Sequence, residues 1–209
     1  MSSILETIQD EPSFDLTGGH ISLDFANTVD DRASSPRDGL PAYRHLVSWG
    51  MQSRILTSEQ AEQLLIAAAE HEREAAAVLE RAKEVREVMF RIFSAIASEA
   101  APSEVDLAHL NEELARTMEH ACIVQNGQHF VWDWCAGTVM LDRALWPVVR
   151  AAADLLASDE LRMVRLCAAE DCGWLFLDTS KNQTRRWCSM KSCGNRAKAR
   201  RYTTRKRGQ

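Results

Sequence analysis

Long apolar runs are missing from this chain of 209 residues. No segment reaches the roughly 18 consecutive apolar residues that a helix needs to cross a bilayer. The opening residues, MSSILETIQDEPSFD, also lack the basic start and the apolar stretch of a secretion signal. We therefore expect a soluble protein of the cytoplasm that has no membrane partner.

Catalytic motifs are equally scarce. No Ser-His-Asp or Cys-His arrangement stands out along the chain. His71-Glu72 begins like the motif of a zinc protease, but Ala75 stands where that motif requires a second histidine. The Gly18-Gly19 pair lacks the lysine and the spacing of a phosphate-binding loop. We therefore predict a protein that is not an enzyme.

Acidic residues are almost absent from the last part of the chain. Residues 161–209 hold 13 Lys and Arg against 3 Asp and Glu, whereas residues 1–160 hold 12 against 27. The formal net charge of -5 therefore hides a domain at -15 and a segment at +10. Such a division is typical of chains in which one part meets a polyanion. The length allows one core of ordinary size plus a small module, so we predict two domains, 1–160 and 161–209.

Apolar residues recur at helical spacing through most of the first domain, and turn residues separate the segments. We expect helices at about 22–29, 42–51 and 103–120, two helices within 57–101, and a helical stretch at 138–157 that Pro147 kinks or splits. Thr57 and Gln60 have the spacing of a capping box. The sequence AAAEHEREAAA marks the place where the two helices of 57–101 separate.

Two short hairpins interrupt these helices. Phe14–Leu16 and His20–Leu23 flank a glycine pair, and apolar residues flank a two-residue turn at Asn126-Gly127. Cys122 and Cys135, in or near the second hairpin, are interpreted as core residues. The predicted fold class is mainly α: a helical N-terminal domain with small β-hairpins, followed by a small four-cysteine module with a short β-hairpin and a basic helix.

The other four cysteines form two pairs, Cys167 with Cys172 and Cys188 with Cys193, in the spacing C-x4-C-x15-C-x4-C. Two short loops of this kind let four thiolates surround one ion, and Zn2+ prefers four tetrahedral ligands in structural sites. Unlinked or redox-active thiols and a different metal are the alternatives. We predict one structural zinc ion, which would supply much of the folding free energy of so small a module.

Lysine and arginine dominate the segment around the second cysteine pair, and no acid occurs within Lys181–Arg207. If Cys193 caps a helix, the backbone N–H groups of Gly194 and Asn195 can face a phosphate. The helix then has basic residues on two sides and no apolar stripe. We predict base contacts from Asn195 and Arg196. Phosphate contacts are predicted from Lys181, Arg185, Arg186 and Lys191, and a merely solvated tail is the alternative. The predicted DNA-binding residues are Arg185, Arg186, Lys191, Asn195, Arg196, Lys198, Arg200, Arg201 and Arg205.

Asp24 and Asn27 lie three residues apart in the segment SLDFANT, on one side of the expected first helix. With Arg44 or His45 they would line a pocket for a small-molecule effector. Helix capping and hydrogen bonds within the domain are the alternative explanation.

The tetrapeptide Cys193-Gly194-Asn195-Arg196, within RRWCSMKSCGNR, resembles the CGNR zinc finger. The segment GGHISLDFANT resembles the opening of the ABATE-type domain that accompanies this finger in bacterial transcription regulators. Together the two resemblances cover nearly the whole chain. They imply a DNA-binding regulator whose first domain senses stress or a small molecule, and they favour a homodimer.

Three functions fit these observations. The first is a zinc-dependent, DNA-binding transcription regulator. The second is an RNA- or ribosome-binding protein, because the basic segment suits structured RNA, and Tyr202 and Trp187 can stack on unpaired bases. The third is a protein-interaction module whose basic segment docks on acidic surfaces, including its own N-terminal domain in an autoinhibited state.

Overall fold

The computed structural model describes residues 13–135, 137 and 139–207, apart from five side chains of the last helix. The helices are α2 (Ile21–Ala26), α3 (Tyr43–Gln52), α4 (Ser58–Glu70), α5 (Glu72–Ala97), α6 (Glu104–Met118), α7 (Trp146–Leu156) and α8 (Asn195–Arg207), with a 3-10 turn η1 (Asp159–Met163) and a π-type turn η2 (Met190–Gly194). The strands form three antiparallel pairs, β1 (Val29–Asp30) with β2 (Arg37–Asp38), β3 (Ala121–Asn126) with β4 (His129–Trp134), and β5 (Val164–Leu166) with β6 (Leu175–Leu177).

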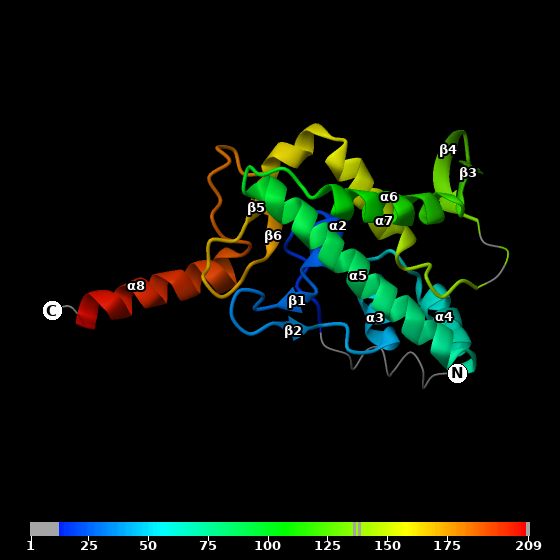
Figure 1. Cartoon of the computed structure of the whole chain (residues 1–209), viewed down its shortest axis with the longest axis horizontal. Helices are drawn as coiled ribbons and strands as arrows, with labels where there is room; N and C mark the ends of the chain where they lie inside the picture. The colour runs from blue at the N-terminus through cyan, green and yellow to red at the C-terminus, as the bar shows by residue number, and fades with distance from the viewer. Residues whose placement is uncertain (1–12, 136, 138, 208–209) are drawn as a thin grey trace.

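The helices gather around α5, while the β3–β4 hairpin and α8 project at opposite ends of the molecule (Figure 1). This arrangement confirms the prediction of a mainly α fold with small hairpins. Within the described part of the chain, no helix has both the length and the apolar character needed to cross a membrane.

Helix α5 is the centre of the main core, and it contacts α2, α3, α4 and α6. Its buried side chains recur three or four positions apart, so one apolar stripe faces the neighbouring helices. They include Val78, Ala82, Val85, Met89 and Ile92. Each large side chain buried in this way stabilises the fold by about 2 kcal/mol relative to exposure.

The segment 57–101 folds as two separate helices, as predicted. Thr57 Oγ1 accepts the N–H of Gln60 at 3.2 Å, and Gln60 Oε1 accepts the N–H of Thr57 at 3.0 Å, so both bonds of the capping box form. Helix α4 ends at Glu70, His71 leaves helical geometry, and α5 begins at Glu72. The separation therefore falls within the alanine-rich segment where we expected it.

Two details of the first domain differ from prediction. Residues 14–23 form no hairpin, because the N–H of Gly18 donates to Asp24 Oδ1 at 2.7 Å instead of to a neighbouring strand. The carbonyl of Gly18 accepts the N–H of Leu177, in β6, at 2.8 Å. Pro147 neither kinks nor splits a helix, since it stands in the first turn of α7, where its missing N–H costs no hydrogen bond.

The interpretation of Cys122 and Cys135 as core residues is wrong, because the two form a disulfide bond at the base of the β3–β4 hairpin. Cys122 is half-buried and Cys135 is exposed. The hairpin itself is confirmed, with Asn126 opposite His129 across the turn. Core burial was the wrong inference because most of the hairpin lies at the surface, where Phe130 is 71% exposed.

The C-terminal module shares the core of the helical domain. Strands β5 and β6 supply Val164, Leu175 and Leu177 to the main cluster of buried residues. Asn27, at the end of α2, binds both backbone groups of Leu175: its Oδ1 accepts the N–H at 2.9 Å, and its Nδ2 donates to the carbonyl at 2.8 Å. The indole N–H of Trp174 donates to the carbonyl of Val29 at 3.0 Å. These contacts hold the module against α2.

Candidate zinc centre and nucleic-acid interface

Four thiols converge in the C-terminal module. The Sγ atoms of Cys167, Cys172, Cys188 and Cys193 lie within 4.8 Å of one another, and all four residues are buried and free of disulfides. Cys188 Sγ lies 3.6 Å from the Sγ of Cys172 and 3.6 Å from that of Cys193. A tetrahedral ion with Zn–S bonds of about 2.3 Å places its sulfur ligands roughly 3.8 Å apart. The four thiols therefore have the spacing and the chemistry that a zinc ion requires.

A small apolar cluster supports the thiols. Strand β5 leads directly into Cys167, whose N–H donates to the carbonyl of Trp174 at 2.8 Å, so the first cysteine loop folds back before β6 begins. Phe176 is fully buried among the cysteines, and Trp174 and Trp187 pack against this cluster. One phenyl ring and two half-buried indoles make a very small core, so metal binding must supply most of the stability of the cysteine loops.

Four sulfur atoms at this spacing cannot all carry a negative charge without a cation. Hydrogen bonding with Cys167 raises the pKa of Cys172, and contacts with Cys167 and Cys172 raise the pKa of Cys188. A divalent ion reverses this preference, because it stabilises every thiolate that it binds. Two further donors support the charge: the N–H of Cys188 lies 3.4 Å from Cys167 Sγ, and Arg196 Nη2 lies 3.1 Å from Cys193 Sγ.

Ion pairs tie the first turns of α8 to the first cysteine loop. Asp171 Oδ2 lies 2.7 Å from Arg200 Nη2 and 3.7 Å from Arg196 Nη1. Glu170 Oε2 lies 3.6 Å from Arg200 Nη1. Arg196 and Arg200, both predicted to contact DNA, therefore orient α8 relative to the thiols. The sequence alone did not indicate a role for these two acids, although they are two of only three in residues 161–209.

Arg185 has a structural role that the sequence did not indicate. Its guanidinium lies 4.5 Å from the ring centroid of Phe176. Its N–H groups donate to the carbonyl oxygens of Thr17, Leu177, Trp187 and Cys188. These carbonyls belong to the helical domain, to β6 and to the second cysteine loop, so one side chain joins three segments. Arg185 therefore has few donors left for the predicted phosphate contact.

The expected phosphate contact at the N–H groups of Gly194 and Asn195 is wrong, because η2 continues directly into α8. The N–H of Gly194 donates to the carbonyl of Ser189 at 3.0 Å, and the N–H of Asn195 donates to carbonyls within the same turn, including that of Met190. The side chain of Asn195 donates to the carbonyl of Lys191 at 3.0 Å. The helical path therefore begins at Met190, before the position that the sequence suggested.

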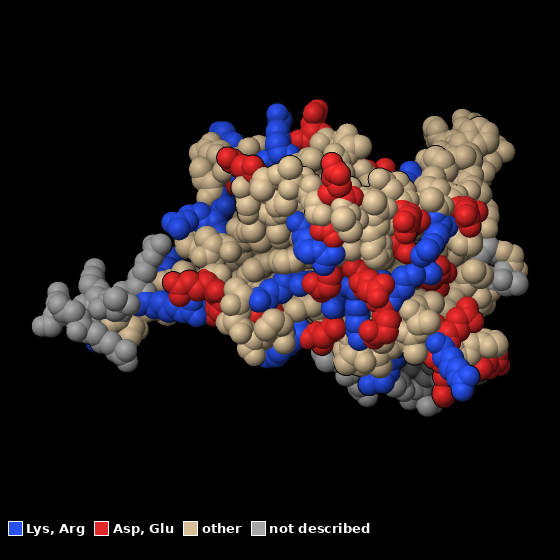
Figure 2. Space-filling view, in the orientation of Figure 1, with Lys and Arg blue, Asp and Glu red and all other residues tan. Residues whose placement is uncertain are grey.

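Other predicted DNA contacts lie at the surface. Arg186, Lys191 and Lys198 are exposed, and Arg186 Cζ lies 5.5 Å from the ring centroid of Trp187. Arg201 and Arg205 are part of α8, but their side chains lie outside the described residues. Helix α8 extends away from the body of the protein (Figure 1), and basic side chains lie beside acidic ones where it departs (Figure 2). Lys191 and Lys198 therefore flank the start of α8.

Of the three residues predicted to line a ligand pocket, Asn27 has a structural role instead. Asn27 is 3% exposed, and both ends of its amide bind the backbone of Leu175. Burial raises the pKa of Asp24 to about 6, although the N–H of Gly18 that it accepts acts in the opposite direction. Arg44 is exposed on α3. Asp24, Asn27 and Arg44 line neither the cavity beside the zinc centre nor the cavity beside α4.

Comparison with known families divides the chain in two. The family model described as "ABATE: Putative stress-induced transcription regulator" matches residues 19–159, and the model described as "CGNR zinc finger" matches residues 163–206. No curated protein matches the chain. All four converging cysteines lie within the second match, and they form the site of one structural zinc ion.

Proposed function

The chain belongs to the ABATE family and carries a CGNR zinc finger, and we propose that it is a transcription regulator whose finger presents α8 to duplex DNA. The observation that carries this proposal is the attachment of α8. Ion pairs hold its first turns against the cysteine loop, while the rest of the helix extends away from the protein (Figure 1). A polyanion is the partner that suits a projecting basic helix.

In this proposal the zinc ion has a structural role. Four thiolates fill its tetrahedral shell and leave no position for a substrate, so the ion is not a catalytic centre. We propose a protein that is not an enzyme. Cys193 lies in η2, directly before α8. The ion therefore fixes the start of the DNA-binding helix, and DNA affinity should depend on it.

The contacts divide into two kinds. We propose phosphate contacts from the exposed Arg186, Lys191 and Lys198. Arg201 and Arg205, which follow in the sequence of α8, are proposed to make further phosphate contacts. Base contacts require side chains at the exposed start of the helix, and Asn195 is the candidate there. Arg196 acts as a positioning residue, because its guanidinium already contacts Cys193 and Asp171.

Titration of the zinc-loaded protein with duplex DNA at several salt concentrations tests this proposal. We expect affinity to fall steeply with salt, and Lys198→Ala to reduce the slope of log K against log salt by about 1 because one phosphate contact is lost. Arg73→Ala is the matched control, since it removes an exposed cation from α5 in the acidic domain. DNA affinity that changes neither with Lys198→Ala nor with zinc removal would contradict the proposal.

Two other functions receive less support. RNA binding remains the second candidate, and competition between duplex DNA and total RNA separates it from the first. Trp187, however, is half-buried against the cysteines, with Arg186 near its ring, and is poorly placed to stack on a base. Docking of α8 on the acidic domain is also less favoured, because Arg196 and Arg200 of α8 form ion pairs with Glu170 and Asp171, which belong to the zinc module.

We further propose that the helical domain senses an effector, that the protein acts as a homodimer, and that it works in the cytoplasm of a bacterial cell, where the chromosome lies. Analytical ultracentrifugation measures the oligomeric state, and cell fractionation measures the localisation.

Disulfides are rare in reducing compartments. In the cytoplasm, the Cys122–Cys135 bond would therefore form and break with the redox state of the cell.

A further inference from the structure

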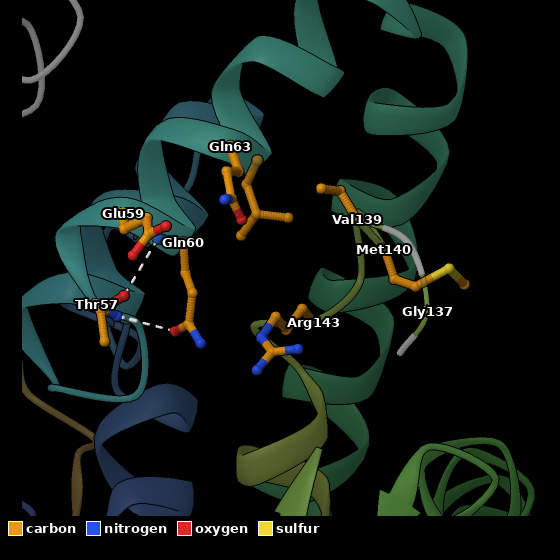
Figure 3. Close-up of a pocket in the computed structure, with 9 residues that line it drawn as sticks. Thr57, Glu59, Gln60, Gln63, Gly137, Val139, Met140 and Arg143 are labelled. Carbon is orange, nitrogen blue, oxygen red and sulfur yellow. Dashed lines mark hydrogen bonds between the residues drawn. The ribbon is translucent and has the colours of Figure 1, made fainter. Parts of the chain in front are cut away.

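A cavity of about 530 Å³ lies between the first two turns of α4 and the segment that leads into α7. Gln60 and Leu64 line it from α4, and Val139, Met140 and Arg143 line it from the other side (Figure 3). A volume of this size suits a small organic molecule. No residue that we assign to zinc or DNA binding lines this cavity, so it is a separate site.

Two hydrogen-bond donors face each other across the cavity. Gln60 Oε1 accepts the N–H of Thr57 in the capping box at 3.0 Å, and this bond turns Gln60 Nε2 toward the cavity. The guanidinium of Arg143 points toward it from the opposite side (Figure 3). Because one donor cannot satisfy another, the group that bridges these two must be an acceptor.

Arg143 also lacks a counter-ion in the part of the chain that the structure describes, where no carboxylate oxygen lies within 4.0 Å of it. The carboxylate of Asp142 lies instead 2.6 Å from Arg81 Nη2. The one hydrogen bond of the Arg143 guanidinium runs to the carbonyl of Trp134 at a long 3.4 Å. A half-buried guanidinium beside a cavity, with no anion to neutralise it, favours an anionic ligand.

We propose that this cavity binds a small organic carboxylate. The carboxylate lies between Arg143 and Gln60, and the apolar part of the molecule packs against Leu64, Val139 and Met140. Arginine recognises carboxylates through paired, charge-assisted hydrogen bonds, which the amide of Gln60 supplements. Leu64 is buried, whereas Val139 is 47% exposed and gains burial when a ligand covers it.

The acidic residue Glu59 also lines the cavity. A free α-amino acid would place its ammonium group near this carboxylate, whereas a simple carboxylic acid has no such group. Both ligands share the carboxylate that Arg143 and Gln60 bind, so they differ only in their use of Glu59. The test therefore includes one probe of each kind.

A ligand at this site would regulate DNA binding only if the proposed function is correct. Arg143 lies just before α7, α7 packs on α2, and Asn27 at the end of α2 holds β6 of the zinc module. A ligand that shifts the start of α7 thus has a short packed route to the DNA-binding module. Ligand binding itself requires no DNA.

Isothermal titration of the full-length, zinc-loaded protein, without DNA, tests the proposal. The probes are isovalerate, L-leucine and isopentylamine, which share a similar branched chain. We expect saturable binding of isovalerate, of L-leucine or of both, and none of isopentylamine, which has no carboxylate. Tighter binding of L-leucine supports an amino-acid site that uses Glu59, and equal binding supports a general carboxylate site. Absence of binding by both carboxylates at millimolar concentration overturns the proposal.

Gln60→Glu is the sharpest variant, because it keeps the oxygen that caps α4 and replaces the donor that faces Arg143 with a second acceptor. We expect carboxylate affinity to fall at least tenfold while the melting temperature stays unchanged or rises. Arg143→Gln should weaken binding to a similar extent. Arg150→Gln is the control, since Arg150 lies on α7 against Trp132 and outside the cavity.

Undiminished binding by Gln60→Glu and Arg143→Gln would overturn the assignment of these residues. DNA titrations on the same preparations separate the two proposals. A protein that binds isovalerate but no DNA contradicts the proposed function and leaves the site intact. A protein that binds DNA but neither carboxylate contradicts the proposed carboxylate site and leaves the proposed function intact.

Discussion

The helical domain and the cysteine loops of the zinc module bury different kinds of side chain. The first packs aliphatic and aromatic residues around α5, among them the fully buried Trp49, Phe25 and Phe93. The second buries four thiols around a single phenyl ring, Phe176. Apolar burial contributes about 25 cal/mol per Å², which a large core can accumulate and a few loops cannot. The cysteine loops therefore need an ion for their stability, whereas the helices do not.

The boundary between the apolar core and the loops that zinc stabilises does not coincide with a single position in the sequence. Strands β5 and β6 adjoin the cysteines in sequence, yet Val164, Leu175 and Leu177 pack in the core of the helices. The hairpin is therefore stabilised by apolar contacts and by Asn27, and it carries the loops that zinc stabilises. Three perturbations separate these contributions.

Zinc removal should have the largest effect, since binding of structural zinc to small modules is worth about 10–16 kcal/mol. We expect a chelator, or Cys188→Ser, to unfold the cysteine loops and α8. The β5–β6 hairpin and the helices of the N-terminal domain should remain folded. Amide hydrogen exchange measures this directly: protection is lost in residues 167–174 and after residue 178, and it is retained in α5. Loss of protection in α5 would show that the two parts are not separable. Cys135→Ser under reducing conditions is the control, because Cys135 lies outside the zinc cluster.

Asn27→Ala should lower the free energy of unfolding by about 2–3 kcal/mol, because it leaves the buried N–H and carbonyl of Leu175 without partners. Chemical denaturation measures the change. Asn182→Ala, at an exposed position of the zinc module, should have little effect. An equal effect of the two substitutions would mean that the contact of Asn27 with β6 does not join the domains.

Asp24→Asn should have the smallest effect, and the effect should depend on pH. Burial raises the pKa of Asp24 from 3.8 to about 6 in the folded protein. A raised folded pKa means that the contribution of this group to stability is present below about pH 4 and is lost as pH rises through 6. The asparagine retains the oxygen that accepts the N–H of Gly18 and never ionises. We therefore expect the variant to be more stable than the wild type by about 1–2 kcal/mol at pH 7 and equal to it near pH 4.

Thermal denaturation across this pH range measures the difference. Asp159→Asn, at an exposed position, should give a curve parallel to that of the wild type. Parallel curves for Asp24→Asn as well would mean that Asp24 ionises normally in the folded protein.

Features with local causes could be predicted from the sequence. The capping box at Thr57 depends on residues three apart, and the β3–β4 hairpin depends on its turn. The zinc ligands follow from the spacing of Cys167, Cys172, Cys188 and Cys193, because short loops already bring each pair together. Each of these features is set by a few neighbouring residues, so no knowledge of the tertiary fold is needed.

Features that join distant segments could not be predicted. Asn27 binds Leu175 across 148 residues, and Arg185 reaches Thr17 across 168, so neither role has a local signal. The sequence therefore suggested a ligand contact for Asn27 and a DNA contact for Arg185, because neither side chain has a visible local partner. The donors that face each other at Gln60 and Arg143 likewise become neighbours only when α4 packs beside the segment before α7.

The pairing of Arg200 with Asp171 and Glu170 has a consequence for how the protein would search along DNA. A phosphate that approaches Arg200 must displace a carboxylate 2.7 Å away, so the affinity gained there is only the difference between two ion pairs. If α8 binds DNA as proposed, the two acids would keep the helix oriented while no phosphate is bound and would lower its affinity for any one site. Weak, exchangeable contacts of this kind favour rapid sliding over tight non-specific capture.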